Sequence, residues 1–264
     1  VTADTELTPY DFGTGASRVT YILGNAVQEA AGNAKAMLLE AAAHKLGVVD
    51  PKKLRAEQGM IYMRGFPDQS VTVAEAAWTS ERVLGKPVMG IGSFTPAATG
   101  LDPVTGHGKA FEVHIFATQI AEVEVDTETG EVDVLKLVAV HDCGTAINPM
   151  FVEGQIEGGV VMGLGYGMIE EIVENETTGE LLTRSFTDYK IPTIRDMPAE
   201  VIVDIVEVPE EEGPFGAKGV GEPTNLPTAP ALINAIYDAI GVQIRDLPAT
   251  PEKILEALAA KEGT

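Results

Sequence analysis

Residues 120–171 carry the strongest structural signals of the chain: IAEVEVDTETGEVDVLKLVAVHDCGTAINPMFVEGQIEGGVVMGLGYGMIEE. Apolar and polar residues alternate on both sides of the turn TETG, which predicts an antiparallel hairpin. Asn148 followed by Pro149 is a favoured helix start, so we expect a helix over residues 151–171. Its six glycines each cost about 0.5–1 kcal/mol relative to alanine. Glycines in such number indicate that another helix or a ligand approaches the backbone closely.

Helices and strands are expected on both sides of this segment. Apolar positions three or four residues apart predict a long helix over residues 17–47, which Gly47 would end. Thr72 and Glu75 have the spacing of a capping box. We further expect strands at 59–65, 181–186 and 200–208, a loop at 85–110, and helices opening at Pro51, at Ala229 and at Pro251.

The mixture of helices and hairpins lacks a regular βαβ alternation, so the sequence favours the α+β class. We expect a single domain over residues 1–264, or alternatively two subdomains at about 1–110 and 111–264. No apolar run reaches the roughly 20 residues of a membrane-spanning helix. The first residues lack the pattern of a signal peptide, and we expect a cytoplasmic protein.

The formal net charge of -22 disfavours nucleic acid and anionic membranes as partners. A solvated surface is the ordinary explanation for the acid excess; a saline habitat or a docking face for a basic partner are the alternatives. Cys143 is the only cysteine, so the chain can form no internal disulfide and no CxxC metal site. We expect Cys143 to be a small buried structural residue.

The loop from Gly213 to Pro223 is rich in glycine and contains Lys218 and Glu222. Consecutive backbone N–H groups in such a loop can turn toward an anion. It is not a nucleotide-binding P-loop, because Gly219 follows the lysine where Ser or Thr is required. The pattern alone leaves Glu222 either as a catalytic carboxylate or as a solvated or helix-capping one. The four histidines show no metal-binding spacing.

Four segments, in order along the chain, resemble the molybdenum hydroxylase family, to which xanthine dehydrogenase belongs. They are GTGASRVTYILGNAV (13–27), HDCGTAINPMFVEGQIEGGVVMGLG (141–165), GPFGAKGVGEP (213–223) and DLPATPEKILEAL (246–258). The likeness is to the C-terminal part of the molybdopterin-binding subunit, its second molybdopterin-binding domain. Bacterial hydroxylases of N-heterocycles and hydroxybenzoyl-CoA reductases resemble the chain most.

The resemblance implies a role for particular residues. Glu222 would be the catalytic base, and Gln155 would contact the pterin dinucleotide. Alternatively, Gln155 is a surface amide, Ser17 caps the first long helix and Lys218 is solvated. No side chain is expected to bind the molybdenum. The remaining residues expected at the cofactor are Thr14, Gly15, Ala16, Ser17, Lys218, Val220 and Gly221.

The implied activity is oxidative hydroxylation, with water, of an electron-poor carbon in a purine- or nicotinate-like N-heterocycle or an aldehyde. Glu222 would deprotonate the attacking oxygen, and the cofactor would be a molybdenum–pterin in its cytosine dinucleotide form. Electrons would leave through [2Fe–2S] clusters to FAD. One cysteine cannot hold such clusters, so both groups would lie on other subunits. The alternatives are reductive dehydroxylation of an aromatic acyl-CoA and a non-catalytic scaffold subunit.

The sequence is short for this family. The upstream half of the molybdenum subunit, with its GQG-type pterin motif, is not in the sequence. We therefore expect it on a separate chain or in a missing segment, beside an FAD subunit, a [2Fe–2S] subunit and a small aromatic substrate.

Overall fold

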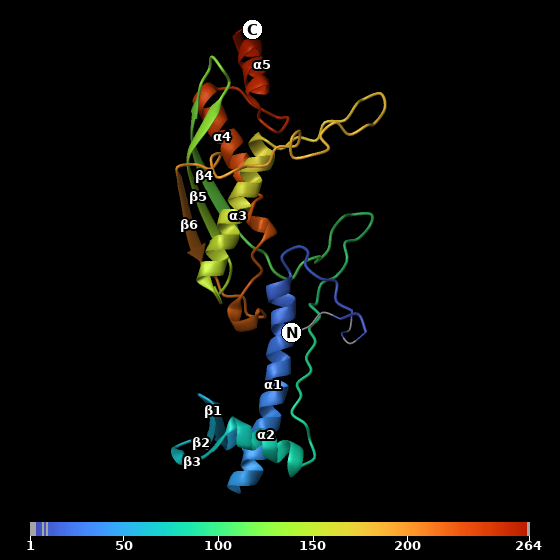
Figure 1. The fold of residues 1–264 in the computed structure, drawn as a ribbon, viewed down its shortest axis with the longest axis vertical. Helices are drawn as coiled ribbons and strands as arrows, with labels where there is room; N and C mark the ends of the chain where they lie inside the picture. Colours follow the sequence, from blue (N-terminus) through green and yellow to red (C-terminus); the bar gives the residue numbers. More distant parts are fainter. Residues whose placement is uncertain (1–3, 7, 9, 263–264) are drawn as a thin grey trace. The chain divides into compact units, whose positions relative to one another are not determined.

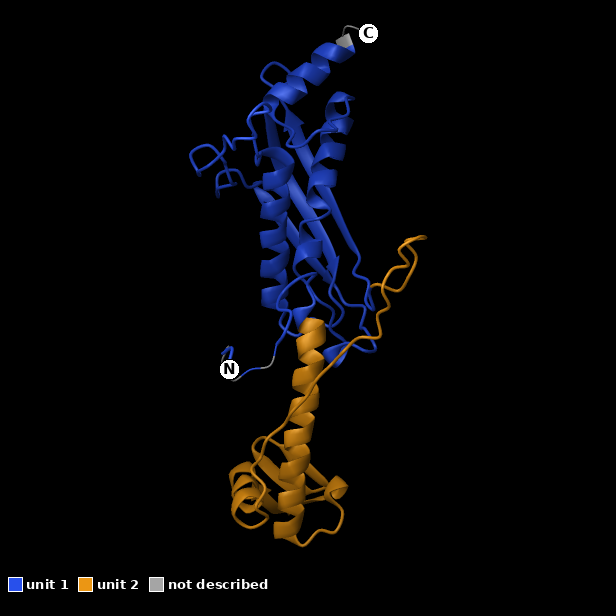
Figure 2. Ribbon diagram, turned by 90° about the vertical axis from the view of Figure 1, so that its right-hand side faces the viewer, with its two compact units in different colours: residues 1–19, 111–264 blue, residues 20–110 orange. Residues whose placement is uncertain are grey.

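A computed structural model describes residues 4–6, 8 and 10–262. The chain forms two compact units, shown in separate colours in Figure 2. Unit 1 consists of Val1–Val19 and Phe111–Thr264, and unit 2 consists of Thr20–Ala110. The first nineteen residues thus belong with the C-terminal part of the chain. None of the described helices is long and apolar enough to cross a membrane.

Unit 2 is a long helix with a small antiparallel sheet and a second helix. Its core joins Ala42 and Ala43 of the long helix to Leu54, Ile61 and Val71 of the sheet. The strand order is β1-β2-β3. The elements are α1 (Val19–Leu46), η1 (Pro51–Lys53), β1 (Leu54–Glu57), β2 (Met60–Met63), β3 (Phe66–Thr72) and α2 (Val73–Arg82).

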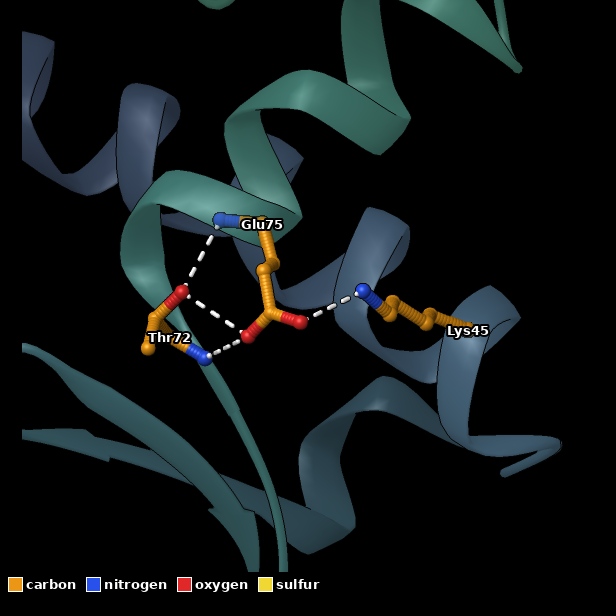
Figure 3. Close-up of polar contacts among 3 residues, drawn as sticks. All are labelled: Lys45, Thr72 and Glu75. Atoms are coloured by element: carbon orange, nitrogen blue, oxygen red, sulfur yellow. Dashed lines mark hydrogen bonds and ion pairs between the residues drawn. The ribbon is translucent and has the colours of Figure 1, made fainter.

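The helix ends of unit 2 follow the sequence signals. Gly47, with a φ of 67°, comes directly after α1. Thr72 and Glu75 form both hydrogen bonds of the predicted capping box, and Lys45 of α1 lies 2.8 Å from the Glu75 carboxylate (Figure 3). These interactions, led by the hydrogen bond from Lys45, lower the pKa of Glu75 to about 2. The predicted strand around Tyr62 and the short helix at Pro51 are also present.

The segment after α2 contains no helix or strand, so the loop predicted at residues 85–110 is confirmed. It runs beside α1 (Figure 1), where Gly90 and Gly92 contact the helix backbone. A Cβ on Gly92 would lie 2.6 Å from the nitrogen of Ala30. The Asn33 amide donates to the Ile91 carbonyl at 2.7 Å. Backbone contact of this kind leaves no room for a side chain, which accounts for glycine here.

Unit 1 is a three-stranded sheet of order β4-β5-β6 with helices packed against it (Figure 1). The β4–β5 hairpin is antiparallel as predicted, whereas β5 and β6 are parallel and are connected through α3. The α+β class is confirmed. The elements are β4 (Ala117–Val125), β5 (Val132–Asp142), α3 (Pro149–Met168), β6 (Glu200–Val206), η2 (Pro214–Gly216), η3 (Glu222–Thr224), α4 (Thr228–Ile240) and α5 (Pro251–Glu262).

The strand predicted at residues 181–186 is wrong. That segment is mostly irregular, and its only ladder contact among the described residues is an isolated bridge between Glu174 and Leu181. Phe186 is 78% exposed, so the apolar residues of this stretch find no sheet face to cover. A short segment of this composition becomes a strand only where a neighbouring strand supplies the hydrogen bonds.

The core of unit 1 lies between the sheet and α3. Leu137 of β5 packs with Ile156, Val160 and Leu164 of α3 and with Leu232 of α4. Each of these side chains is at most 2% exposed. Full burial of a Leu, Ile or Val side chain contributes about 1.5–3 kcal/mol, so this cluster orients α3 on the sheet.

A row of glycines on α3 brings η3 and α4 against the helix. A Cβ on Gly159 would lie 2.6 Å from the Cβ of Thr224, and one on Gly163 would lie 2.5 Å from the Cβ of Thr228. Gly167 makes the next contact, 3.0 Å from a methyl group of α4. These are the glycines that the sequence predicted to allow close approach to the helix, and they leave room for the segment that begins with Glu222.

Candidate cofactor-binding site

The loop that ends at Glu222 is attached to the C-terminal end of β5. Gly144 and Ala217 form an isolated antiparallel bridge, and the backbone N–H of Lys218 donates to the Cys143 carbonyl at 2.9 Å. Cys143 is buried, as the sequence suggested, and burial raises the pKa of its thiol. The strand thus determines where the glycine-rich loop starts.

The side chain of Lys218 forms a buried ion pair with Asp142. The ammonium lies 2.6 Å from one carboxylate oxygen, and both side chains are 6% exposed. The ammonium also donates to the His114 carbonyl at 3.3 Å, and the second Asp142 oxygen accepts from the Gly144 N–H at 2.9 Å. Because the ammonium is used inside the protein, we propose a structural role for Lys218 in place of direct contact with a cofactor.

The segment around Ser17 lies directly against the same loop. Ala16 and Ser17 have φ values of 51° and 53°, a left-handed conformation that costs non-glycine residues energy. The Ser17 hydroxyl accepts a hydrogen bond from the Glu222 N–H at 2.9 Å. A Cβ on Gly219 would lie 2.9 Å from the Ser17 carbonyl carbon. Residues some 200 positions apart in the sequence are therefore held in one site.

Two sets of backbone N–H groups at this site have no hydrogen-bond partner in the part of the chain that the structure describes. Among the described residues, no hydrogen bond is formed by the N–H groups of 14–17 or of 219–221. The Gln155 side chain is exposed on α3 and forms no hydrogen bond within the described part of the chain. Its oxygen lies 3.7 Å from the position of a Cβ on Gly221. The structure thus brings Gln155, the Ser17 segment and Gly221 together.

The carboxylate of Glu222 is exposed and forms no hydrogen bond or ion pair with any described residue. Its backbone is nevertheless anchored, because it opens η3 and donates to Ser17. A fixed backbone with an unengaged carboxylate suits a group that accepts a proton from a bound reactant.

These groups fit an anionic organic cofactor. The unpartnered N–H groups and the Gln155 amide can donate to phosphate, pterin or carbonyl oxygens. The described residues contain no cluster of three or more His, Cys, Asp or Glu that could hold a metal ion.

Four residues of the site were not predicted. Gln119 of β4, His141 of β5, Thr224 of η3 and Thr228 of α4 form a hydrogen-bond network that is buried except for the half-buried Gln119 and that includes Thr224, two residues after Glu222. One sequence signal was available: Gln119 falls on the inward-facing positions of β4, which are otherwise apolar. A polar residue on such a face needs partners.

The fold and the site suit a domain that binds an anionic organic cofactor beside an exposed carboxylate. Residues 1–198 match the molybdopterin cofactor-binding domain, and the chain belongs to this family. The resemblance inferred from the sequence is thereby confirmed. Glu222 lies outside the matched residues, so its role depends on the geometry described above.

The chain is 34% identical over 98% of its length to a probable hypoxanthine oxidase, XdhD, of Escherichia coli, and covers 25% of it. It is 34% identical over 94% of its length to the nicotine 6-hydroxylase large subunit of Paenarthrobacter nicotinovorans, and covers 30% of it. The structure of quinoline 2-oxidoreductase from Pseudomonas putida 86 superposes with a TM-score of 0.81, at 28% identity, over 96% of this chain and 32% of that one. The chain thus spans a quarter to a third of these relatives.

Proposed function

We propose that this chain supplies the proton-accepting half of a molybdenum hydroxylase site. In the proposed reaction, an oxygen atom from water is added to an electron-poor carbon of an aromatic N-heterocycle or an aldehyde. Glu222 takes the proton from the attacking oxygen. The observation that carries the proposal is the Glu222 carboxylate, which is exposed and has no partner among the described residues, while its backbone is anchored next to N–H groups that likewise have none there.

In this proposal the residues of this chain bind the cofactor and orient the base. The N–H groups of residues 14–17 and of 219–221, with the Gln155 amide, donate hydrogen bonds to the anionic pterin dinucleotide, which we propose is the cytosine form. The bound molybdenum–pterin group supplies a Lewis acid and a two-electron acceptor. Glu222 is placed by the Ser17 hydroxyl, so that its carboxylate can accept a proton without a large rearrangement.

Other polypeptide segments are needed for the full reaction. The single cysteine, Cys143, cannot bind iron–sulfur clusters, so electrons would pass to [2Fe–2S] and FAD groups on other subunits. Apolar side chains on α3 are exposed, with Phe151 67%, Met150 65% and Met162 62% accessible. Exposed apolar groups in this number favour a partner surface, for which we propose the N-terminal half of the molybdenum subunit.

The test is Glu222→Gln in the complete molybdenum-containing enzyme that includes this sequence. Turnover is measured with hypoxanthine, nicotinate, quinoline and benzaldehyde, using a dye as electron acceptor. Removal of a general base should lower kcat at least about 100-fold, while the molybdenum content stays unchanged. The amide keeps the shape of the side chain but cannot accept the proton.

Glu211→Gln is the matched control. Glu211 is an exposed acid eleven positions earlier, outside the site, and its replacement should leave turnover within twofold of wild type. A Glu222→Gln enzyme that retains more than a tenth of wild-type turnover would contradict the proposal. Loss of molybdenum from this variant would instead assign Glu222 to cofactor retention.

A further inference from the structure

Gln119 lies at the centre of the hydrogen-bond network that contains Thr224, two residues after the proposed base. It projects from β4 and is half-buried. Its amide nitrogen donates to the Thr224 carbonyl at 2.8 Å and lies 3.0 Å from His141 Nε2. Its amide oxygen accepts a hydrogen bond from the Thr228 hydroxyl at 2.7 Å. One side chain therefore connects β4, β5, η3 and the first residue of α4.

The orientation of the Gln119 amide is determined by its partners. The Thr224 carbonyl can only accept, so the amide nitrogen must face it. The second hydrogen of that nitrogen then points to His141 Nε2, which must be the acceptor of a neutral imidazole. Burial, which lowers the pKa of His141, favours this neutral form. Gln119 thus uses both donors and its acceptor in one arrangement.

The network fixes the backbone one residue before and two residues after Glu222. Thr224, 1% exposed, is anchored to Gln119 through its carbonyl. Its hydroxyl donates to the Gly221 carbonyl at 2.5 Å, and its N–H donates to the same oxygen at 3.0 Å. The Glu222 N–H is bound by Ser17. Glu222 itself contributes no side-chain contact to this framework.

We propose that Gln119 is a positioning residue that holds Glu222 in place through Thr224. The inference rests on the proposed role of Glu222 as the base. A carboxylate without partners of its own is placed only by its backbone, and displacement of a reacting group by about 1 Å can reduce the rate 100-fold. Loss of the Gln119 amide therefore affects the proton-transfer step more than the binding of substrate.

The experiment uses Gln119→Met in the complete enzyme, with the best of the four substrates named above. Methionine keeps the length of the side chain and removes the three hydrogen bonds. We expect kcat to fall about 10- to 100-fold, KM to change less than threefold, and molybdenum content to stay normal. Hydrogen–deuterium exchange of residues 219–226 should become faster. Thr118→Val, an exposed position on the same strand, is the control and should change none of these readouts.

A second pair of variants keeps the proposal testable if Gln119→Met does not fold. Thr228→Val removes one contact to the Gln119 oxygen, and Thr228→Ser retains it. Thr228→Val should have a lower kcat than the wild type, and Thr228→Ser should have a kcat close to that of the wild type. Equal turnover of the two variants would overturn the proposal.

The outcomes separate this inference from the proposed function. One possible outcome is that Glu222→Gln loses activity while Gln119→Met keeps the wild-type kcat and the wild-type hydrogen–deuterium exchange. This result would overturn only the positioning role. Wild-type turnover in Glu222→Gln would refute the base and, with it, the positioning of a base. Faster exchange in Gln119→Met would then show that the amide orders the segment for another purpose.

Discussion

Alanine at Gly163 tests the close packing that brings η3 and α4 onto α3. The new Cβ would lie 2.5 Å from the Cβ of Thr228 and 2.7 Å from the carbonyl oxygen of Asn225. Carbon atoms pack at about 3.5–4.0 Å, so the helix and its neighbour must separate by roughly 1 Å. Both neighbours belong to the segment that follows Glu222, and a shift of this size would reach the proposed base.

The expected loss of stability follows from two opposing contributions. Overpacking of a core contact costs about 1–3 kcal/mol, whereas replacing a helical glycine by alanine gains about 0.5–1 kcal/mol. The net effect of Gly163→Ala is then a loss of up to about 2.5 kcal/mol. For a unit of this size, such a loss lowers the Tm by up to roughly 10 °C.

Gly158→Ala is the matched control on the same helix. No atom lies within 4 Å of a Cβ at Gly158, so this variant gains helix propensity without a clash. Its free energy of unfolding should rise by about 0.5–1 kcal/mol. Thermal and urea unfolding of both variants provide the measurement. Gly163→Ala as stable as Gly158→Ala would refute the close packing of α3 and α4.

Two further predictions concern charged side chains. Removal of the ammonium in Lys218→Met leaves the buried Asp142 carboxylate without its counter-ion, which should lower the free energy of unfolding in urea by about 3–5 kcal/mol; adding Asp142→Asn should recover part of the loss. A double variant with the same free energy of unfolding as Lys218→Met, or a lower one, would show that the two residues are not coupled. The ionised Glu75 carboxylate stabilises unit 2 at pH values above 4.5, the ordinary pKa of a glutamate. This stabilisation is lost as the pH falls toward about 2, the pKa of Glu75 in the folded protein. In Lys45→Met the pKa of Glu75, followed by NMR, should rise toward 4.5; an unchanged pKa would contradict the main role given to Lys45.

Local signals in the sequence predicted most of the elements. The capping box at Thr72, the Asn148–Pro149 helix start and the turn between β4 and β5 each depend on residues within about ten positions. Such interactions form wherever the segment folds, so they can be recognised without tertiary information. The strand expected at 181–186 failed because a strand also requires a neighbour, which no local pattern supplies.

The candidate site was only partly accessible from the sequence. Glycine and glutamate in the loop 213–223 indicated a site, and the resemblance to a family assigned roles to Glu222 and Gln155. The partners of Lys218 were not foreseen, because Asp142 lies 76 positions away. Nor was the function of Gln119 apparent, since its partners come from three other elements of the fold.

The sequence by itself determined the α+β class, the family and the identity of the proposed base. These follow from residue order, periodicity and short motifs, which are local properties of the chain. Only the tertiary structure decided that Ser17 binds the Glu222 N–H, that Lys218 is neutralised by Asp142, and that glycines of α3 admit η3 and α4. Those relations depend on distances between residues far apart in the chain, which are set by the joint packing of sheet and helices.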